Sequence, residues 1–478
     1  MTSIAALPTP HALTAGAARA LGVVVALLAG WLFTAGWDAN QRLITATLAA
    51  ATAAWVVTKV DDTVIALTAV VGLALAGAVP TETVFGALGD PTIWLLVGSC
   101  MLAAGLTASG LADRAAIALV ARARTVRGLW YRTCLALIIT TFAVPATSGR
   151  AALAMPVFKS MASALPAAHQ RALSLLFPAV ILLSAFASIL GAGAHLVAAS
   201  LIEAATGTRI SFVWWLALGA PVAVLTCLVA TELVLLGWLT RDQRRLPVGD
   251  VVHAVAANQP PATPITAAEL RALLLLVAVV ALWLTEPLTG LSPALVALAG
   301  GLATVLPMIG TTTPKKAFAA VPWSLLVFLA ATLALGTALV TSGAADRLAQ
   351  AALGALQGAL TGDVLLAIVA ASAFTHLLVQ SRTARSTVLL PIVIVIAMGV
   401  GLNPVSAALA STAAAGFCLT LTSSAKPVAM FASVEGVATF DRRALLTLAG
   451  LVAPFVIATT LAAAVWLWPL LGIPLLAR

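Results

Sequence analysis

The chain has 478 residues, of which 62% are apolar and only 9% are Asp, Glu, Lys or Arg. Roughly a quarter of the residues in an ordinary soluble domain are charged, so this composition excludes a water-soluble globular enzyme. The net charge of +9 is spread along the chain and not gathered into a basic domain or tail, which argues against nucleic-acid binding.

Apolar runs between charges and Pro or Gly clusters predict the helices in chain order. A spanning helix needs about 20 mainly apolar residues. The first half predicts helices near 19–36, 41–58 and 63–80, then a segmented region over 92–206 and a helix at 211–240. The second half predicts helices near 270–286, 292–309 and 322–342, then a segmented region over 363–440 and a helix at 443–476. We therefore expect an all-α polytopic membrane protein with about 11 transmembrane helices.

Two short segments recur in the same order. Ser109–Arg114 is similar to the segment at 342–347, and Ser148-Gly149-Arg150 before Pro156 is similar to Thr383-Ala384-Arg385 before Pro391. This duplication predicts inverted-topology repeats, which in transporters place a substrate site at broken helices near the bilayer midplane. The predicted organisation is a first repeat within 1–240 with a re-entrant hairpin near 129–160, a cytoplasmic linker at 241–268, and a second repeat within 269–478 with a hairpin near 363–398.

Charge near the predicted helix ends sets the orientation. With the N-terminus in the cytoplasm, most Lys and Arg residues lie inside and the outer cations are Arg42, Arg209, Arg347 and Arg478. This asymmetry follows the positive-inside rule. We expect a multi-pass protein of the plasma (inner) membrane.

The hairpins carry the candidate substrate site. A turn around 145–149 places Arg150 near mid-bilayer, and Gly149 beside it is a candidate for close backbone approach to the substrate. Arg382 and Arg385 lie in the matching position of the second hairpin. Buried cations of this kind normally face a cavity or a ligand, and an arginine fork matches an oxyanion. Hydroxyl groups beside them add hydrogen-bond donors at a helix start: Thr147, Ser148, Ser381 and Thr383. The alternative is that an arginine reaches an interface or pairs with a loop carbonyl.

Clustered small and polar residues predict unwound backbone in the helices after each hairpin. They occur at 188–201, with Gly191 and Gly193, and at 420–427, with Ser423, Ser424 and Lys426. Irregular backbone in a membrane is tolerated where it lines a cavity. We expect the two serines and Lys426 to contact the anion, or Lys426 to lie near an interface.

Three further ionisable residues are candidates for coupling transport to protons: His195, His376 and Glu232. The alternative for each is a hydrogen bond or ion pair with a neighbouring helix. No constellation of catalytic or metal-binding residues is recognised, so we expect no enzyme activity, no metal site and no cofactor.

The residues resemble the divalent anion:sodium symporter family of dicarboxylate, citrate and sulfate carriers. The likeness covers nearly the whole chain and rests on the paired hairpins and on three segments, at 91–98, 106–112 and 212–221. The family carries a Ser-Asn-Thr motif at each hairpin tip. Here the corresponding residues are Ala146-Thr147-Ser148 and Ser381-Arg382-Thr383, so both asparagines are absent. The resemblance implies an elevator-type motion and a homodimer, with sodium as the usual coupling ion.

These observations predict a secondary transporter of small divalent anions, dicarboxylate-like or sulfate-like. Because arginines stand at or beside the expected cation sites, we expect sodium-independent exchange. The alternatives are a sodium- or proton-coupled symporter and a membrane anion sensor without transport.

Overall fold

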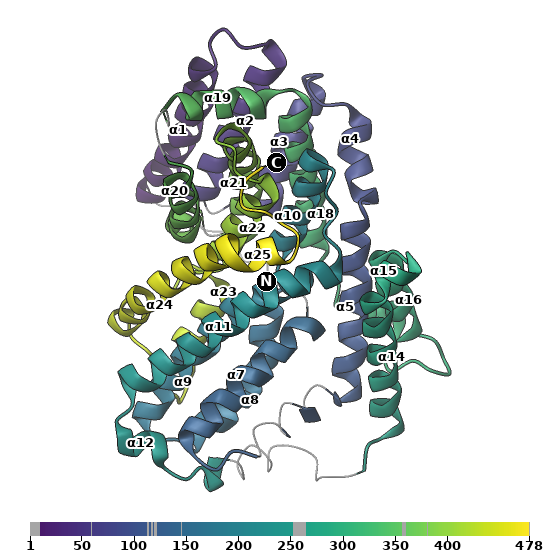
Figure 1. Ribbon diagram of the computed structural model, residues 1–478, viewed down its shortest axis with the longest axis vertical. Coiled ribbons are helices and arrows are strands. Elements are labelled where there is room, and N and C mark those ends of the chain that lie inside the picture. The colour runs from purple at the N-terminus through teal and green to yellow at the C-terminus, as the bar shows by residue number, and fades with distance from the viewer. Residues whose placement is uncertain are drawn as a thin grey trace.

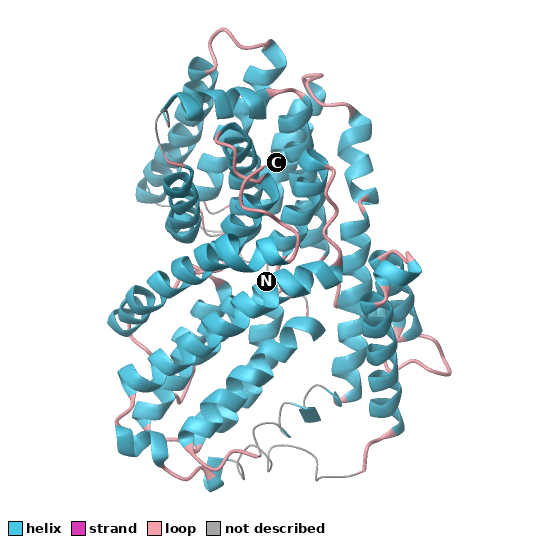
Figure 2. Ribbon diagram, viewed as in Figure 1, coloured by secondary structure: helices cyan, strands magenta, loops and turns pink. Residues whose placement is uncertain are grey.

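The computed structural model describes residues 10–477, except 59, 112–113, 116–117, 119–121, 145, 252–263, 356–359 and 380. This part of the chain is helical and contains no strand (Figure 2). Within it, seven helices are long and apolar enough to cross a membrane, and four shorter helices are also apolar. The prediction of an all-α polytopic protein is confirmed.

The first half contains the helices α1 (Pro10–Phe33), α2 (Ala39–Val57), α3 (Asp62–Leu75), α4 (Thr81–Gly86), α5 (Pro91–Ser109), α7 (Val126–Ala143), α8 (Thr147–Ser163), α9 (Ala167–Ser184), α10 (Gly193–Thr206), α11 (Phe212–Trp238) and α12 (Arg241–Arg245). Three short 3-10 turns interrupt it: η1 (Ala87–Gly89), η2 (Ala185–Ala187) and η3 (Ile189–Gly191). The predicted linker at 241–268 begins with α12, and its residues 252–263 lie outside the described residues.

The second half contains α14 (Ala267–Leu284), α15 (Glu286–Thr289), α16 (Pro293–Ala303), α17 (Pro314–Ala319), α18 (Trp323–Thr341), α19 (Ala344–Ala355), α20 (Thr361–Phe374), η4 (Thr375–Leu377), α21 (Arg382–Gly399), α22 (Pro404–Ala414), α23 (Lys426–Ala432), α24 (Arg442–Ala462), the π-helical η5 (Ala463–Leu467) and α25 (Trp468–Leu470).

Most predicted helices agree with the structure to within a few residues. Some predicted helices extend beyond the observed C-terminal end, and α3 shows the reason. This helix stops at Leu75 and not at 80, because Gly77 adopts a left-handed φ of +74° and Pro80 precedes the next helix. Apolar composition alone continues through this turn, but a positive φ ends a helix.

The two halves repeat the same order of elements. α8 begins at Thr147, and the corresponding helix of the second half, α21, begins at Arg382, 235 positions later. α10 begins at Gly193, and its counterpart α23 begins at Lys426, 233 positions later. The halves also interlock: α10 packs against α21 and α22, and α18 packs against α3 (Figure 1). The returning hairpin helices α8 and α21 are therefore related by the repeat.

The helix that follows each hairpin is broken. α9 ends at Ser184 and, after two 3-10 turns, α10 begins at Gly193; α22 ends at Ala414 and α23 begins at Lys426. Gly191 is required in the first break, because a Cβ there would lie 2.0 Å from the Ala185 carbonyl oxygen. At both breaks a new helix begins, and the first backbone N–H groups of that helix have no partner within it. These N–H groups can donate hydrogen bonds to a ligand in an adjacent cavity.

Candidate functional site

A cavity of about 370 Å³ lies where the hairpins and broken helices meet. Six helix starts contribute to its wall: α3 (61–63), α8 (146–148), α10 (192–193), α18 (322–328), α21 (381–385) and α23 (424–427). Helix N-termini carry unpaired N–H groups and partial positive charge. Their convergence favours an anion.

Arg385 is the most deeply buried cation in the wall of this cavity. Its side chain is 1% exposed, and Nη2 donates to the sulfur of Cys418 at 2.9 Å. Nε and Nη1 are buried and have no hydrogen-bond partner among the described residues. A buried charge with unpaired donors is costly, so the site is suited to a ligand that accepts these hydrogen bonds.

Arg382 adds a second partly paired guanidinium. Its Nη2 lies 3.1 Å from Nε2 of His195, and its Nε and Nη1 are buried without a partner within the described part of the chain. Together the two arginines offer four such N–H-bearing atoms around one cavity. Planar forks of this kind bind carboxylate or another oxyanion with two parallel hydrogen bonds.

Most of the other predicted site residues are brought together here. The cavity wall includes Thr147, Ser148, Ser381, Thr383, Ser424 and Lys426. Lys426 is exposed at the start of α23. Gly149 and Ser423 are not in the wall of the cavity.

Arg150 is also outside the wall, in contrast to the predicted ligand role. Its side chain is 0% exposed, and its donors are satisfied by protein oxygens. Nε donates to Thr140 Oγ1 at 3.0 Å, Nη1 to the Ile181 carbonyl at 2.9 Å, and Nη2 to the Leu137 carbonyl at 2.7 Å and to Ser184 Oγ at 2.6 Å. The guanidinium is therefore turned toward α7 and α9.

Neither histidine lies in the cavity wall. His195 Nδ1 lies 3.0 Å from the Ser188 carbonyl oxygen, which assigns the ring proton to Nδ1 and leaves Nε2 to accept from Arg382. His376 lies between the Ala373 carbonyl and Thr420 Oγ1, at 2.7 and 2.6 Å. Both rings are held by hydrogen bonds, which is the alternative to proton coupling.

Glu232 lies on α11 and pairs with α7. It accepts from Arg127 Nη2 at 2.9 Å and from the Tyr131 hydroxyl at 2.6 Å. It is not in the cavity wall. This placement matches the alternative of an ion pair between neighbouring helices.

Sequence reasoning missed several residues of the cavity. Asp61 and Asp62 begin α3, Phe328 lies on α18, and Cys418 lies in the break after α22. Two adjacent carboxylates between apolar runs were the available signal. Both carboxylates line the same cavity as Lys426.

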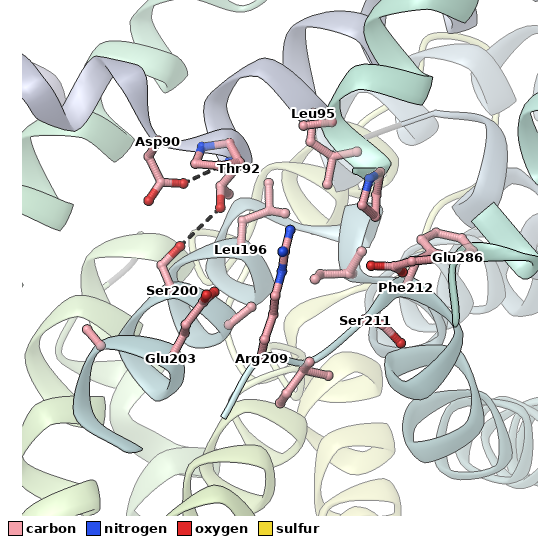
Figure 3. A pocket seen from close by; sticks show the side chains of 17 residues that line it. Asp90, Thr92, Leu95, Leu196, Ser200, Glu203, Arg209, Ser211, Phe212 and Glu286 are labelled. Atoms are coloured by element: carbon pink, nitrogen blue, oxygen red, sulfur yellow. Dashed lines mark hydrogen bonds between the residues drawn. The ribbon is translucent and has the colours of Figure 1, made fainter. Parts of the chain in front are cut away.

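A second cavity, of about 340 Å³, lies between α5, α10 and the start of α11 (Figure 3). Its labelled charged residues are Asp90, Glu203, Arg209 and Glu286. Thr92 bridges α5 and α10 through a 3.0 Å contact with Ser200. Because carboxylates dominate this wall and no hairpin-tip residue is in it, the first cavity is the better candidate for binding an anion.

Known proteins were compared with the chain as a whole. A membrane protein of Cupriavidus necator is 25% identical over 405 residues, which cover 82% of this chain and 76% of the relative. The solved YdaH transporter of Alcanivorax borkumensis is similar with a TM-score of 0.56 and 17% identity, over 83% of this chain and 89% of YdaH. Neisseria gonorrhoeae MtrF, described as illuminating a class of antimetabolite efflux pumps, is similar with a TM-score of 0.57 and 13% identity, over 96% and 95% of the two chains.

These structural likenesses show a shared fold of membrane transporters. The family described as the sodium:sulfate symporter transmembrane region matches residues 1–474. This match confirms the resemblance found in the sequence, and it makes the protein a transporter and not an enzyme. The chain belongs to the sodium:sulfate symporter family, also called the divalent anion:sodium symporter family.

Proposed function

We propose that the protein is a secondary transporter of small divalent anions, dicarboxylate-like or sulfate-like. The observation that carries this proposal is the cavity between the hairpins, where Arg382 and Arg385 present buried guanidinium nitrogens without described partners. Lys426 adds a third cation at the mouth. The family description, which names sulfate as a substrate, points to the same charge class.

The cavity suits a small solute with two negative groups. Its volume of about 370 Å³ lies at the lower end of typical ligand sites, roughly 300–1,000 Å³. Arg382 and Arg385 can bind one anionic group of the solute, and Lys426 can bind the second. Leu182, Leu325 and Phe328 provide an apolar wall that can accept a short carbon skeleton.

The arginines also favour exchange over net uptake. Without an anion, Arg385 is a buried cation that lacks acceptors for two of its nitrogens among the described residues. Moving such a charge past lipid or apolar protein costs several kcal/mol, while a neutralised pair moves more easily. The loaded carrier should therefore reorient faster than the empty one.

Alternating access follows from the repeated architecture. Tip residues of both hairpins line one cavity, which supports an elevator-type movement of the hairpins and broken helices against the remaining helices. We further propose a homodimer in the plasma membrane, with a cytoplasmic N-terminus. Arg150, His195, His376 and Glu232 are not among the residues that we propose to contact the anion.

Uptake into proteoliposomes tests this proposal. We expect radiolabelled sulfate or succinate to enter without sodium, and internal unlabelled anion to accelerate entry at least tenfold. Vesicles loaded with buffer alone provide the baseline. A strict sodium requirement, or equal rates with and without internal anion, would contradict exchange.

A proton-coupled symporter is the second candidate, because Asp62 lines the cavity and interacts with the side chain of Ser381. A protonated Asp62 would remove a negative charge that competes with the substrate. An imposed inward proton gradient should then drive uptake into empty vesicles, and Asp62→Asn should abolish this effect while exchange continues.

A further inference from the structure

The Arg150 guanidinium occupies a cage of four oxygen atoms. Two are backbone carbonyl oxygens, of Leu137 and Ile181, and two are hydroxyl oxygens, of Thr140 and Ser184. The side chain is 0% exposed, and no acidic residue is among these partners. The cage holds a cation through neutral oxygens alone.

This chemistry bears on the sodium ion that the family description implies. Hard metal cations bind carbonyl and hydroxyl oxygens, which are the groups that surround Arg150. In this chain those oxygens already accept hydrogen bonds from a tethered guanidinium. The residues at the first hairpin therefore do not fit a diffusible sodium ion.

The equivalent arginine of the second hairpin has no such oxygen cage among the described residues. Arg385 stands at the equivalent position, and its described hydrogen-bond partner is the sulfur of Cys418. A thiol sulfur is a poor ligand for a hard cation. Each half of the repeat thus carries a buried guanidinium. That of Arg150 is satisfied by oxygens, and that of Arg385 has few described partners.

We propose that Arg150 is a built-in cation that replaces a diffusible alkali cation behind the anion cavity. The cage and the cavity share a wall, since Arg150 binds the Ile181 carbonyl and the next residue, Leu182, faces the cavity. The charge behind the wall is permanent, so anion binding needs no cation from solution. This inference rests on the proposed anion site.

Thermal unfolding of purified variants tests the cage without any anion or transport. Arg150→Ala empties the cage, so added guanidinium should bind the freed oxygens and raise the Tm. We expect a rise of at least about 3 °C in roughly 10 mM guanidinium chloride, relative to choline chloride. Sodium and potassium chloride are tested at equal ionic strength. Arg150→Met is the matched control, because its side chain fills the cage, and it and the wild type should show no rise.

The proposal fails if neither guanidinium nor an alkali cation stabilises Arg150→Ala, or if sodium stabilises the wild type specifically. Should Arg150→Ala not fold, Arg150→Lys keeps a positive charge in the cage. We expect this variant to bind sulfate within about threefold of the wild-type Kd, with no sodium requirement. A loss above tenfold, or a new need for sodium in Arg150→Lys, overturns the built-in cation. A transporter that shows no anion exchange but retains the cation rescue would contradict the proposed function alone.

Discussion

Arg150 and Arg385 occupy the same position in the two repeats and differ in what surrounds their guanidinium groups. Each is the fourth residue of a returning hairpin helix, α8 or α21, and they are 0% and 1% exposed. Arg150 donates four hydrogen bonds to oxygens, whereas the described partner of Arg385 is the Cys418 sulfur. The neighbouring acceptors therefore distinguish a guanidinium that the protein satisfies from one that keeps donors for the proposed anion.

This difference predicts opposite stability changes for the same substitution. Arg150→Met leaves two carbonyls and two hydroxyls without their donor, and a buried polar group that loses its partner costs about 1–3 kcal/mol. Arg385→Met removes a buried charge with few partners and should stabilise the anion-free protein by about 1–3 kcal/mol. Thermal unfolding in anion-free detergent should show a lower Tm for the first and a higher Tm for the second. Shifts of the same sign would contradict the assignment.

The burial of Arg385 and the exposure of Lys426 predict how much each side chain contributes to anion affinity. Arg385→Gln should weaken sulfate or succinate binding at least 30-fold, since truncating a buried charged hydrogen-bond partner costs about 2 kcal/mol or more. Lys426→Gln should weaken it only about two- to fivefold, because Lys426 is exposed. Isothermal titration calorimetry measures both. Lys159→Gln, an exposed change on α8 outside the cavity wall, should leave the Kd unchanged.

Asp62 is predicted to oppose the anion. It lines the cavity, so Asp62→Asn should tighten sulfate binding about three- to tenfold at low ionic strength, with a smaller effect at high salt. Asp363→Asn, an exposed change in the first turn of α20, is the control. Weaker binding in Asp62→Asn would instead mean that this carboxylate holds a positive part of the substrate or orients Ser381.

The contact between α5 and α16 is predicted to require glycine. A Cβ on Gly98 would lie 2.4 Å from the backbone of Ala297 and Leu298, so Gly98→Ala must push the two helices apart. We expect a clear fall in the Tm and in the yield of folded protein. Gly72→Ala in α3 meets nothing within 4 Å and should be neutral or stabilise by up to about 1 kcal/mol, as alanine favours helix. Equal losses for both variants would show that the Gly98 contact is not limiting.

Much of the fold could be predicted because it depends on local composition. Apolar runs of bilayer length placed α11 and α18 to within two residues, and the recurring segments that end in Arg150 and Arg385 coincide with the starts of α8 and α21. The residues that open α8 and α21 were also predicted, since a helix start with hydroxyls and arginines is a local pattern. The end of α3 was not, because a turn at Gly77 leaves the apolar composition unchanged.

The candidate site could be predicted only in part. The cations and hydroxyls of the second hairpin lie in the cavity, but Asp61, Asp62 and Phe328 reach it from helices distant in the sequence. They meet the hairpins only because α3 packs against α18 and α18 packs against α21. A spacing rule along the chain carries no information about such contacts.

The sequence by itself determined a polytopic helical transporter with duplicated hairpins, because bilayer-length apolar runs and repeated motifs are written in the order of residues. Only the tertiary structure decided which arginines line the cavity. The acceptors that enclose Arg150 come from α7 and α9, and the packing of these helices brings Leu137, Thr140, Ile181 and Ser184 to one point. A buried charge takes its role from the partners that surround it, and those partners are assembled by folding.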